Sequence, residues 1–142
     1  MSRRKARILA LEALYAYEIT NAPSEDILQF GWLPEPSGYK DDELAYSRIL
    51  VAGTIENRKR IDKIIRKHLE NWELSRLKRV DLAILRFSVY SLLYHKEIPV
   101  SVIIDEAVEL SSEYSTDDSY KFINAVLDGI KKTLTGEKPD MP

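Results

Sequence analysis

Cationic side chains at the start of this chain are its clearest signal for binding chemistry. Arg3, Arg4, Lys5 and Arg7 stand in the first turns of a segment with helical periodicity. The N-terminus of a helix carries a partial positive charge, so four cations there are locally unfavourable. An external anion such as a phosphate backbone would explain the cluster. A basic terminus that serves only solubility is the alternative, and this stretch alone does not decide between them.

The stretch TDDSYKFINAVLDGI, residues 116–130, raises a second question of binding. At about 100° per residue its apolar stripe consists of Ser119, Ile123, Val126, Leu127 and Ile130. Phe122 lies about 60° or more away from the centre of that stripe, on the side of Asp118 and Lys121. The pattern leaves two interpretations open: Phe122 belongs to the edge of the core, or its ring is offered to a partner.

Side chains suited to catalysis or metal binding form no convincing set. The chain has no cysteine, which excludes disulfides and thiol chemistry. His68 and His95 have no ligand partner at helical spacing, and a packing role is favoured for His68. A carboxylate-rich helix face consists of Asp105, Glu106, Glu109 and Glu113. We interpret it as a solvated face or a surface for a basic protein, with a metal hydrolase as the weaker alternative. We therefore predict no enzymatic activity, no cofactor and no metal.

Composition and charge favour one soluble domain. The chain has 142 residues and a formal net charge of −2, so no global basic field indicates a nucleic-acid partner. Basic residues are nevertheless concentrated locally: residues 58–79 hold nine Lys or Arg against three acids. No apolar run approaches the roughly 18 residues of a membrane span, and Glu12 and Glu18 interrupt any signal-peptide core. We expect a cytoplasmic protein.

Helical periodicity covers most of the chain, and no segment alternates long enough to predict a strand. The expected helices span residues 3–20, a short stretch after Ser24, 41–57, a segment around 61–69, 76–95, 101–114 and 116 to near Gly136. The first of them has an apolar face of Ile8, Leu11, Tyr15 and Ile19. Two prolines and two glycines predict a surface loop at FGWLPEPSGYK, residues 30–40.

Residues 76–95, RLKRVDLAILRFSVYSLLYH, are apolar nearly all round the expected helix. A helix of this kind is buried on both sides, so we place it at the centre of the fold. Helices from the N-terminal half should cover one side and helices from the C-terminal half the other. Arg86 interrupts the apolar surface and requires a buried carboxylate partner, because an unpaired charge there would be costly.

Two segments resemble the NusB family of bacterial transcription antitermination factors: RRKARILALEALYAYEI and LKRVDLAILRFSVYSLLYHKEIPVSVIIDEAVELSSEYSTDDSYKFINAVLDGI. The most specific blocks are the Arg-rich start before ALY, VDLAILR followed by YSLLY, IPVSVIIDEAVEL, and DDSYKFINAVLD. The resemblance covers the first helix and runs continuously from about residue 69 to 132, whereas residues 22–57 carry little of it.

The resemblance implies an all-α fold: two perpendicular three-helix sub-bundles that share a long central helix. A single domain, residues 1–142, would then hold an N-terminal sub-bundle at about 3–70 and a C-terminal one at about 76–135. It also implies binding of boxA in nascent ribosomal RNA, together with NusE, a small-subunit ribosomal protein. The two would act within an antitermination complex on RNA polymerase.

The resemblance further implies two sets of contact residues. The RNA face would consist of Arg3, Arg4, Lys5, Arg7, Asp118, Lys121 and Phe122. The NusE face would consist of Tyr15, Arg79, Val80 and Asp81. In this interpretation Phe122 stacks on a single-stranded base, Lys121 reaches a phosphate, and Asp118 reads a base edge or weakens phosphate attraction.

The sequence departs from the family pattern near the second set of RNA contacts. Ala125 replaces an expected glycine, Tyr120 stands where a smaller or imidazole side chain is expected, and EYSTDD lacks a glycine before its acidic pair. The main alternative function is a homodimeric regulatory module whose interface masks the RNA surface. An RNA methyltransferase, the activity to which NusB-like domains are also fused, is disfavoured because no Gly-rich cofactor loop and no cysteine are present.

Overall fold

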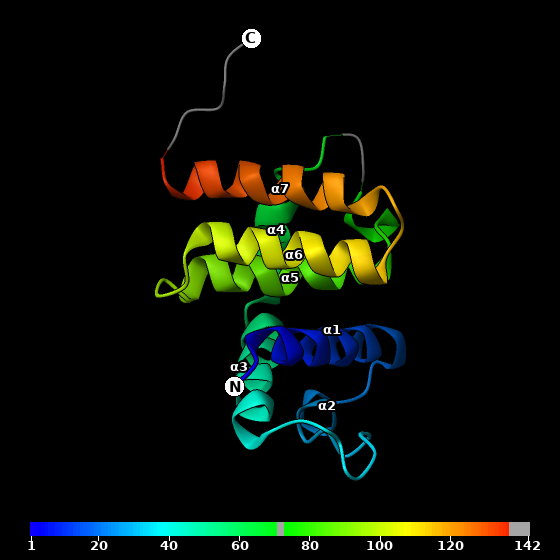
Figure 1. The fold of residues 1–142 in the computed structure, drawn as a ribbon. Coiled ribbons are helices and arrows are strands. Elements are labelled where there is room, and N and C mark those ends of the chain that lie inside the picture. Colours follow the sequence, from blue (N-terminus) through cyan, green and yellow to red (C-terminus); the bar gives the residue numbers. More distant parts are fainter. Residues whose placement is uncertain (71–72, 137–142) are drawn as a thin grey trace.

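A computed structural model describes residues 1–70 and 73–136, and this part of the chain contains helices and no strand. The elements, in chain order, are α1 (Arg3–Thr20), α2 (Ser24–Leu28), α3 (Asp41–Glu56), α4 (Arg58–Arg66), the 3₁₀ turn η1 (Leu74–Arg76), α5 (Arg79–Tyr94), α6 (Val100–Tyr114) and α7 (Ser119–Leu134) (Figure 1). The predicted all-α class is confirmed. None of the described helices is both long and apolar enough to cross a membrane.

The observed helix boundaries lie within about three residues of the predicted ones: α4 ends at Arg66 and not at 69, and α7 begins at Ser119 and not at 116. Two further differences are instructive. The central helix begins at Arg79 rather than 76, because Leu74–Arg76 forms a separate 3₁₀ turn and Leu77 and Lys78 are extended. The short second helix begins at Ser24 and not after it, because Pro23 takes the capping position. Both differences lie at helix starts, where capping geometry rather than periodicity decides the boundary.

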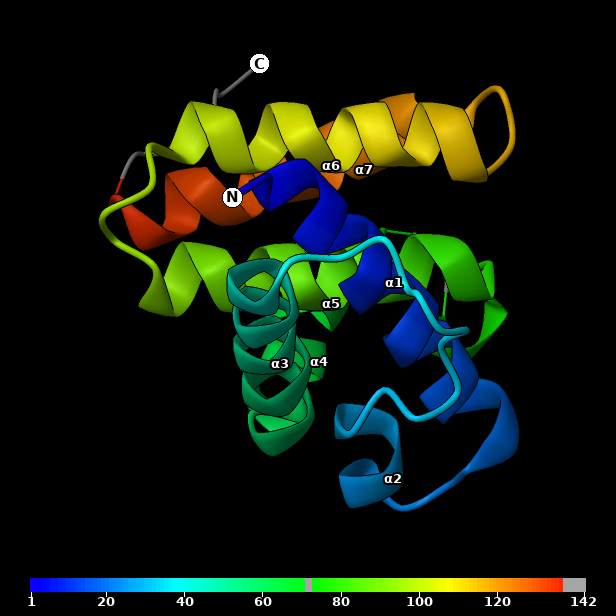
Figure 2. The same ribbon diagram turned by 60° about the horizontal axis from the view of Figure 1, so that its bottom comes forward.

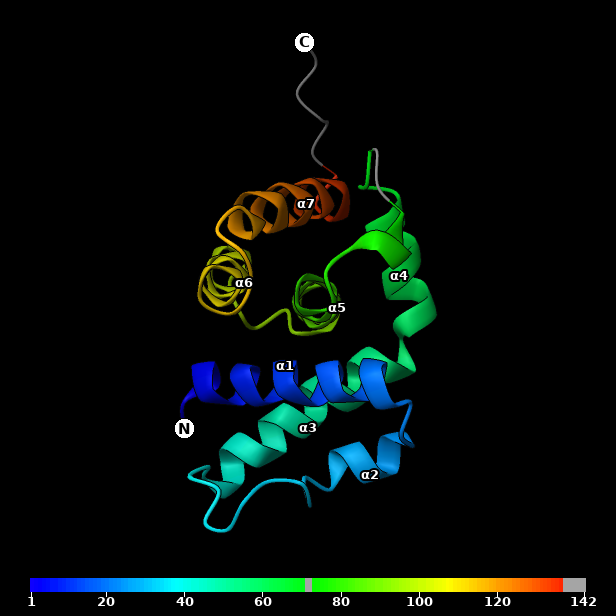
Figure 3. The ribbon, with the colours of Figure 1, turned by 90° about the vertical axis from the view of Figure 1, so that its right-hand side faces the viewer.

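Helix α5 lies at the centre of the molecule, as predicted. Helices α1 and α3 pack on one side of it and α6 and α7 on the other (Figures 1 and 3). Helix α6 runs alongside α5, whereas α1 crosses it (Figure 3). Helix α4 contacts both α5 and α7. Helix α5 therefore packs against helices of both halves of the chain. The predicted division into an N-terminal and a C-terminal sub-bundle near residues 70–76 stays a prediction.

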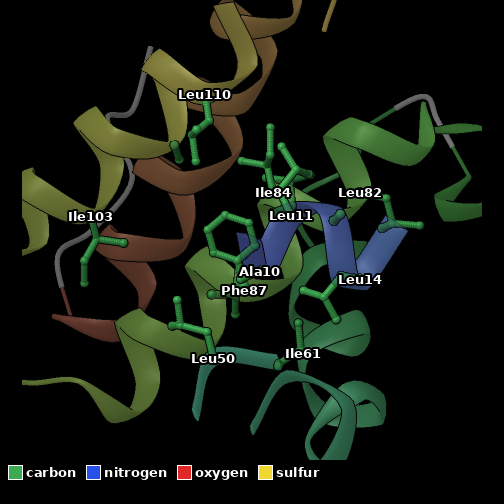
Figure 4. Packing of buried hydrophobic residues seen from close by; sticks show 14 of the residues in the cluster. Ala10, Leu11, Leu14, Leu50, Ile61, Leu82, Ile84, Phe87, Ile103 and Leu110 are labelled. Carbon is green, nitrogen blue, oxygen red and sulfur yellow. The ribbon is translucent and has the colours of Figure 1, made fainter. Parts of the chain in front are cut away.

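The core is continuous through α5. Every residue of this helix from Asp81 to Val89 is buried, and Figure 4 shows Ile84 and Phe87 between Leu110 of α6 and Leu50 of α3. Gly53 of α3 permits the close crossing of α3 over α5, since an added Cβ would overlap the Tyr90 ring. The two-sided apolar pattern of the sequence thus corresponds to two-sided packing.

Helix α1 packs into the core with small residues as well as with leucines. The buried positions include Ala6, Ala10 and Ala13, whereas Tyr15 and Ile19 are 42% and 53% exposed. Small side chains let α1 approach α3 and α5 closely, so the alanine side is the packing side. Of the face predicted from Ile8, Leu11, Tyr15 and Ile19, Leu11 is buried and Ile8 is half-buried, whereas Tyr15 and Ile19 are exposed.

Arg86 has the buried carboxylate partner that the sequence required. Its guanidinium donates to both oxygens of Asp62, Nε at 2.9 Å and Nη2 at 3.0 Å. A third donor, Nη1, reaches Glu18 Oε2 at 3.2 Å, and Glu18 also pairs with Arg58 and Arg79. This network joins α1, α4 and α5, three elements that meet only through tertiary packing.

His95 caps the end of α5 in a half-buried aromatic cluster. Its ring lies 5.1 Å from that of Tyr90 and 6.0 Å from that of Tyr46, and Nδ1 is buried without a partner among the described residues. Burial lowers the pKa of His95, and the positive charges of Arg7 and Arg3 lower it further against the opposing charge of Glu97. The folded protein therefore favours the neutral imidazole.

We expect stability to decline as the pH falls below about 6.5, the ordinary pKa of histidine. In that range the unfolded chain takes up a proton at His95, while the folded protein, with its lowered pKa, does so only at still lower pH. Thermal unfolding at about pH 7.5 and about pH 5.5 should show a smaller difference for His95→Gln than for the natural chain. An identical pH dependence in both proteins would contradict this assignment.

Candidate nucleic-acid interface

A hollow lies in front of Phe122, between the start of α7 and the segment that leads into α5. We call it the Phe122 hollow. Its volume is about 270 Å³, and its lining residues are Arg76, Leu77, Lys78, Asp81, Asp118, Ser119 and Phe122. A single water needs roughly 10–15 Å³, so the hollow has room for a ring system. Phe122 is half-buried, which means that its ring both packs against the core and faces this space.

The polar groups of the Phe122 hollow are connected to one another. The Ser119 hydroxyl donates to Asp81 Oδ2 at 3.0 Å, and the Lys78 ammonium donates to the hydroxyls of Thr116 and Ser119. Asp118, at the start of α7, is exposed. The hollow therefore combines an aromatic face, a cation and carboxylates, which are the groups used to bind an unstacked base and its phosphate.

A second hollow lies where α1 crosses the start of α5 near the end of α6. We call it the Tyr15 hollow; its volume is about 280 Å³, and it is lined by Ile8, Leu11, Glu12, Tyr15, Val80 and Tyr114. Five of these six residues are apolar or aromatic. Exposed aromatic groups in a concave apolar setting are typical anchor sites for a protein partner. Two predicted NusE contacts, Tyr15 and Val80, thus lie in one hollow.

Arg4, one of the N-terminal cations, is held by acidic residues of α6, so the acidic face that we interpreted as solvated or as a surface for a basic protein has a partner within the chain. Arg4 donates to Glu109 at 2.6 Å and to Glu113 at 2.5 Å, and it lies 3.9 Å from Glu106. Packing of α1 on α5 brings the start of α1 beside α6 (Figure 2), and Arg4 thereby reaches Glu109 and Glu113 of the same chain. Within the described ranges, no three His, Asp or Glu side chains gather as a metal site would require.

Arg7 differs from the surface cation that the sequence suggested. It is 5% exposed, and its guanidinium lies 3.9 Å from Glu106. Nη2 of Arg7 and Oε2 of Glu106 are both buried without a hydrogen-bond partner among the described residues. Because Arg7 follows one turn after Arg3 and Arg4 and faces inward, it supports the start of α1 instead of presenting its charge to solvent.

Glu43 anchors the same end of α1. Its carboxylate accepts from the Ser2 amide at 2.7 Å and the Lys40 amide at 2.9 Å, and Lys5 Nζ lies 3.8 Å away. The Lys40 amide first, and then the Ser2 amide, lower the pKa of Glu43. A buried acid of α3 thus fixes where the N-terminal cations begin.

The remaining predicted contact residues lie at the surface with varied partners. Lys5 donates to the Gly38 carbonyl at 2.6 Å, and Arg3 is exposed with no ion pair in the described part of the chain. Lys121 is exposed and lies over the Tyr120 ring, 5.8 Å from its centre, outside the Phe122 hollow. Arg79 is half exposed and pairs with Glu18 at 3.6 Å.

The Arg4 contacts with α6, the Tyr15 hollow and the Phe122 hollow follow one another along the molecule. Glu113, which binds Arg4, precedes Tyr114 of the Tyr15 hollow, and Val80 of that hollow precedes Asp81 of the Phe122 hollow. Asp81 is the one predicted NusE contact found in the Phe122 hollow, where it is 4% exposed. The first turn of α5 therefore separates the two hollows and contributes to both.

Several lining residues were missed by reasoning from the sequence. Arg76 and Lys78 belong to the basic run 58–79 but stand apart from the α4 face where most of that run lies. Tyr114 closes the Tyr15 hollow from α6. The sequence could have pointed to Arg76 and Lys78 through their position on either side of Leu77, just before the central helix. Ala125, the departure from the family glycine, is exposed and lines neither hollow.

Comparisons with known proteins agree on one family. The model of the NusB family matches residues 4–132. The transcription antitermination protein NusB of Treponema denticola is 49% identical over 131 residues, which cover 92% of this chain and 96% of that protein. The Bacillus licheniformis protein of the same name is 40% identical over 134 residues, covering 94% and 99%.

Solved structures lead to the same family. A crystal form of T. maritima NusB has a TM-score of 0.84 at 38% identity and covers 93% of this chain and 92% of that one. A second structure holds the antitermination factors NusB and NusE in complex with double-stranded RNA. It matches with a TM-score of 0.79 at 27% identity and covers 92% of this chain and 96% of that one.

Proposed function

This chain belongs to the NusB family, and from that premise we propose that it is a transcription antitermination factor that binds boxA-type single-stranded RNA together with NusE. The observation that supports this most is the adjacency of the Phe122 hollow and the Tyr15 hollow across the first turn of α5. One suits a base and the other an apolar protein surface, so both partners are able to bind side by side. The proposed complex acts on RNA polymerase, which places the protein in the cytoplasm.

On the RNA side, each proposed group has a physical role. The ring of Phe122 stacks on a base, which contributes about 1–3 kcal/mol. The cations Arg3, Lys5 and Lys121 lie at the surface, where they are able to approach phosphates. Arg4 reaches a phosphate only by leaving Glu109 and Glu113. With few phosphate contacts and a net charge of −2, binding of RNA alone is weak and has a modest salt dependence.

On the protein side, the Tyr15 hollow offers NusE an aromatic anchor in an apolar setting. Tyr15 and Tyr114 are both 42% exposed, and Val80 lies between them and the Phe122 hollow. Arg79 adds a charge at the rim, held by Glu18. NusE bound here lies next to the proposed RNA site and is able to extend the surface that the RNA contacts. Partner-enhanced RNA binding follows from this arrangement.

Fluorescence anisotropy of a labelled boxA-like RNA, titrated with this protein in the presence and absence of NusE, tests the proposal. We expect weak binding alone and clearly tighter binding with NusE. Size-exclusion chromatography of the same samples distinguishes the homodimer alternative, in which a second copy masks the RNA surface. Absence of RNA binding in both conditions would refute the antitermination role.

Neutralising the acids that hold Arg4 should strengthen RNA binding. In Glu109→Gln/Glu113→Gln the Arg4 guanidinium loses its two hydrogen-bonded carboxylates and keeps only Glu106 at 3.9 Å, so it meets a phosphate more readily. An extra phosphate contact and two fewer negative charges should raise RNA affinity several-fold and steepen the salt dependence by about one ion. Glu25→Gln/Asp26→Asn on α2 removes the same charge away from Arg4 and serves as control. An equal gain in the control would show that net charge alone is responsible.

A further inference from the structure

We propose that the outward side of α4 binds the phosphate backbone of an RNA segment that flanks the one held at the Phe122 hollow. Every exposed residue between positions 58 and 67 is a cation, and together these residues form what we call the α4 basic face: Lys59, Arg60, Lys63, Arg66 and Lys67. The inference rests on the proposed RNA-binding function and adds a second contact surface to it.

The cations of the α4 basic face repel one another along the helix. Lys59, Lys63 and Lys67 stand four residues apart, so their side chains project from successive turns on one side. Like charges at this spacing destabilise a helix. The helix dipole favours Lys63 and Arg66, which lie in the last turn. It opposes Lys59 and Arg60, which lie in the first turn. Helix stability therefore does not account for the whole cluster, and an external anion does.

The charge of the α4 basic face is not matched by acids of the described part of the chain. Arg60 donates to the Tyr94 hydroxyl at 2.8 Å, a neutral partner that leaves its charge uncompensated. The acid of the same helix, Asp62, is buried and binds Arg86. The other four cations make no ion pair and no side-chain hydrogen bond among the described residues: Lys59, Lys63, Arg66 and Lys67. This face thus differs from Arg4, which acids of α6 hold.

The α4 basic face adjoins the proposed RNA site. The 3₁₀ turn η1 contacts α4, and its last residue, Arg76, lines the Phe122 hollow together with Lys78. Helix α4 also contacts α7, the helix that carries Phe122 (Figure 3). The exposed acids of the connecting segment, Glu70 and Glu73, lie outside α4. An RNA strand bound at the Phe122 hollow is therefore able to continue past η1 onto α4.

The chemistry of the α4 basic face fits a phosphate backbone better than a protein surface. Its exposed side chains are all Lys or Arg, and the isoleucines of the helix are buried or half-buried. Protein interfaces depend on a few large, well-packed anchors, which the outward side of α4 lacks. A phosphate backbone requires only charge, and such contacts position a strand without reading its sequence. We therefore expect a gain in RNA affinity that is independent of base identity.

The test compares a boxA-like RNA with the same RNA extended by a short single-stranded tract on its 5′ side, its 3′ side or both. Binding to the full chain with NusE is measured by fluorescence anisotropy at several salt concentrations. We expect at least one extension to tighten binding about fivefold and to steepen the salt dependence by about 2, since each of roughly three phosphate contacts adds about 0.7. Uridine and adenosine tracts should act alike.

Lys59→Gln/Lys63→Gln removes two cations from adjacent turns of α4. It should abolish most of the gain from the extension, while binding of the unextended RNA changes by less than about twofold. The melting temperature should stay the same or rise, because a repulsive pair is lost. Arg48→Gln/Lys96→Gln is the matched control: it removes the same charge from exposed positions on α3 and after α5, away from α4 and from both hollows. The control should keep the gain from the extension.

Three results would overturn the inference. Extensions that add no affinity to the natural protein would exclude a contact on α4 while leaving the RNA site at the Phe122 hollow intact. An equal loss of the gain in the α4 variant and in the control would show that net charge alone attracts the flanking RNA. Loss of the NusE enhancement in the α4 variant, with the gain from the extension retained, would assign this face to an acidic protein surface. No binding of any RNA would instead refute the proposed function itself.

Discussion

Replacing Asp62 with alanine is expected to lower the free energy of unfolding by about 3 kcal/mol, the lower end of the range for breaking a buried ion pair. The substitution removes both acceptors of the two hydrogen bonds from Arg86, whose side chain remains in the interior. Glu18 still accepts one bond from Arg86 at 3.2 Å, which keeps the loss at the lower end. Chemical denaturation followed by far-ultraviolet circular dichroism measures the change.

Replacing Arg86 as well as Asp62 isolates the cause of this loss of stability. In Asp62→Ala/Arg86→Met no guanidinium is left without its carboxylate, so a large part of the lost stability should return. Asp128→Ala removes one carboxylate of an exposed ion pair with Lys132 and should cost less than about 1 kcal/mol. A double variant that is as unstable as the sum of both single variants would contradict the view that the unpaired charge is the main cost.

Phe122→Ala is expected to weaken binding of boxA-like RNA by about tenfold or more, since aromatic stacking contributes roughly 1–3 kcal/mol per base. The ring lies at the edge of the Phe122 hollow and also packs against the core, so a decrease in melting temperature should accompany the loss. Anisotropy titration with NusE, together with thermal unfolding of the same samples, measures both effects. Together the two measurements decide whether Phe122 belongs to the core, contacts RNA, or does both.

Two further variants separate these contributions. Phe122→Leu retains most of the buried apolar surface but lacks the aromatic face, so it should bind RNA weakly while unfolding near the temperature of the natural chain. Tyr120→Ala removes an exposed aromatic ring from the same helix at a position outside both hollows. Because this ring lies beneath Lys121, the variant should weaken RNA binding, but by much less than Phe122→Ala. Normal RNA binding by Phe122→Leu would assign Phe122 to the core alone.

The stability network and the proposed binding face are physically linked. Glu18 of α1 joins Arg86 in the interior to Arg79 at the first turn of α5. That turn carries Val80 toward the Tyr15 hollow and Asp81 toward the Phe122 hollow. The ion pairs therefore help to fix the crossing of α1 over α5, on which both hollows depend.

Periodicity in the sequence was sufficient to predict the helices and the centre of the fold. A segment apolar on two sides is stable only when it is covered on both, and α5 is covered in this way. The same reasoning predicted the stripe Ser119, Ile123, Val126 and Ile130, all of which are buried. It also predicted that Arg86 has a carboxylate partner, because a lone buried charge is too costly, but not that the partners are Asp62 and Glu18.

The sequence also identified the family through blocks such as VDLAILR and DDSYKFINAVLD, and the family model matches residues 4–132. Which face of α1 enters the core was not accessible in this way. The predicted face enters the core at Leu11 but is exposed at Tyr15 and Ile19, whereas Ala6, Ala10 and Ala13 are buried. Close helix packing favours small side chains, so hydrophobicity alone does not locate the whole packing face.

Only the tertiary structure decided how the charged groups are paired and which of them remain free. Arg4 and Glu109 are 105 residues apart in the chain, and no local pattern relates them. Asp81 and Phe122 come from different helices, and the space between them exists only because η1, α5 and α7 meet there. Helices arise from local periodicity, whereas hollows and ion pairs arise from contacts between segments far apart in sequence, which is why the sequence determined the former and the folded chain the latter.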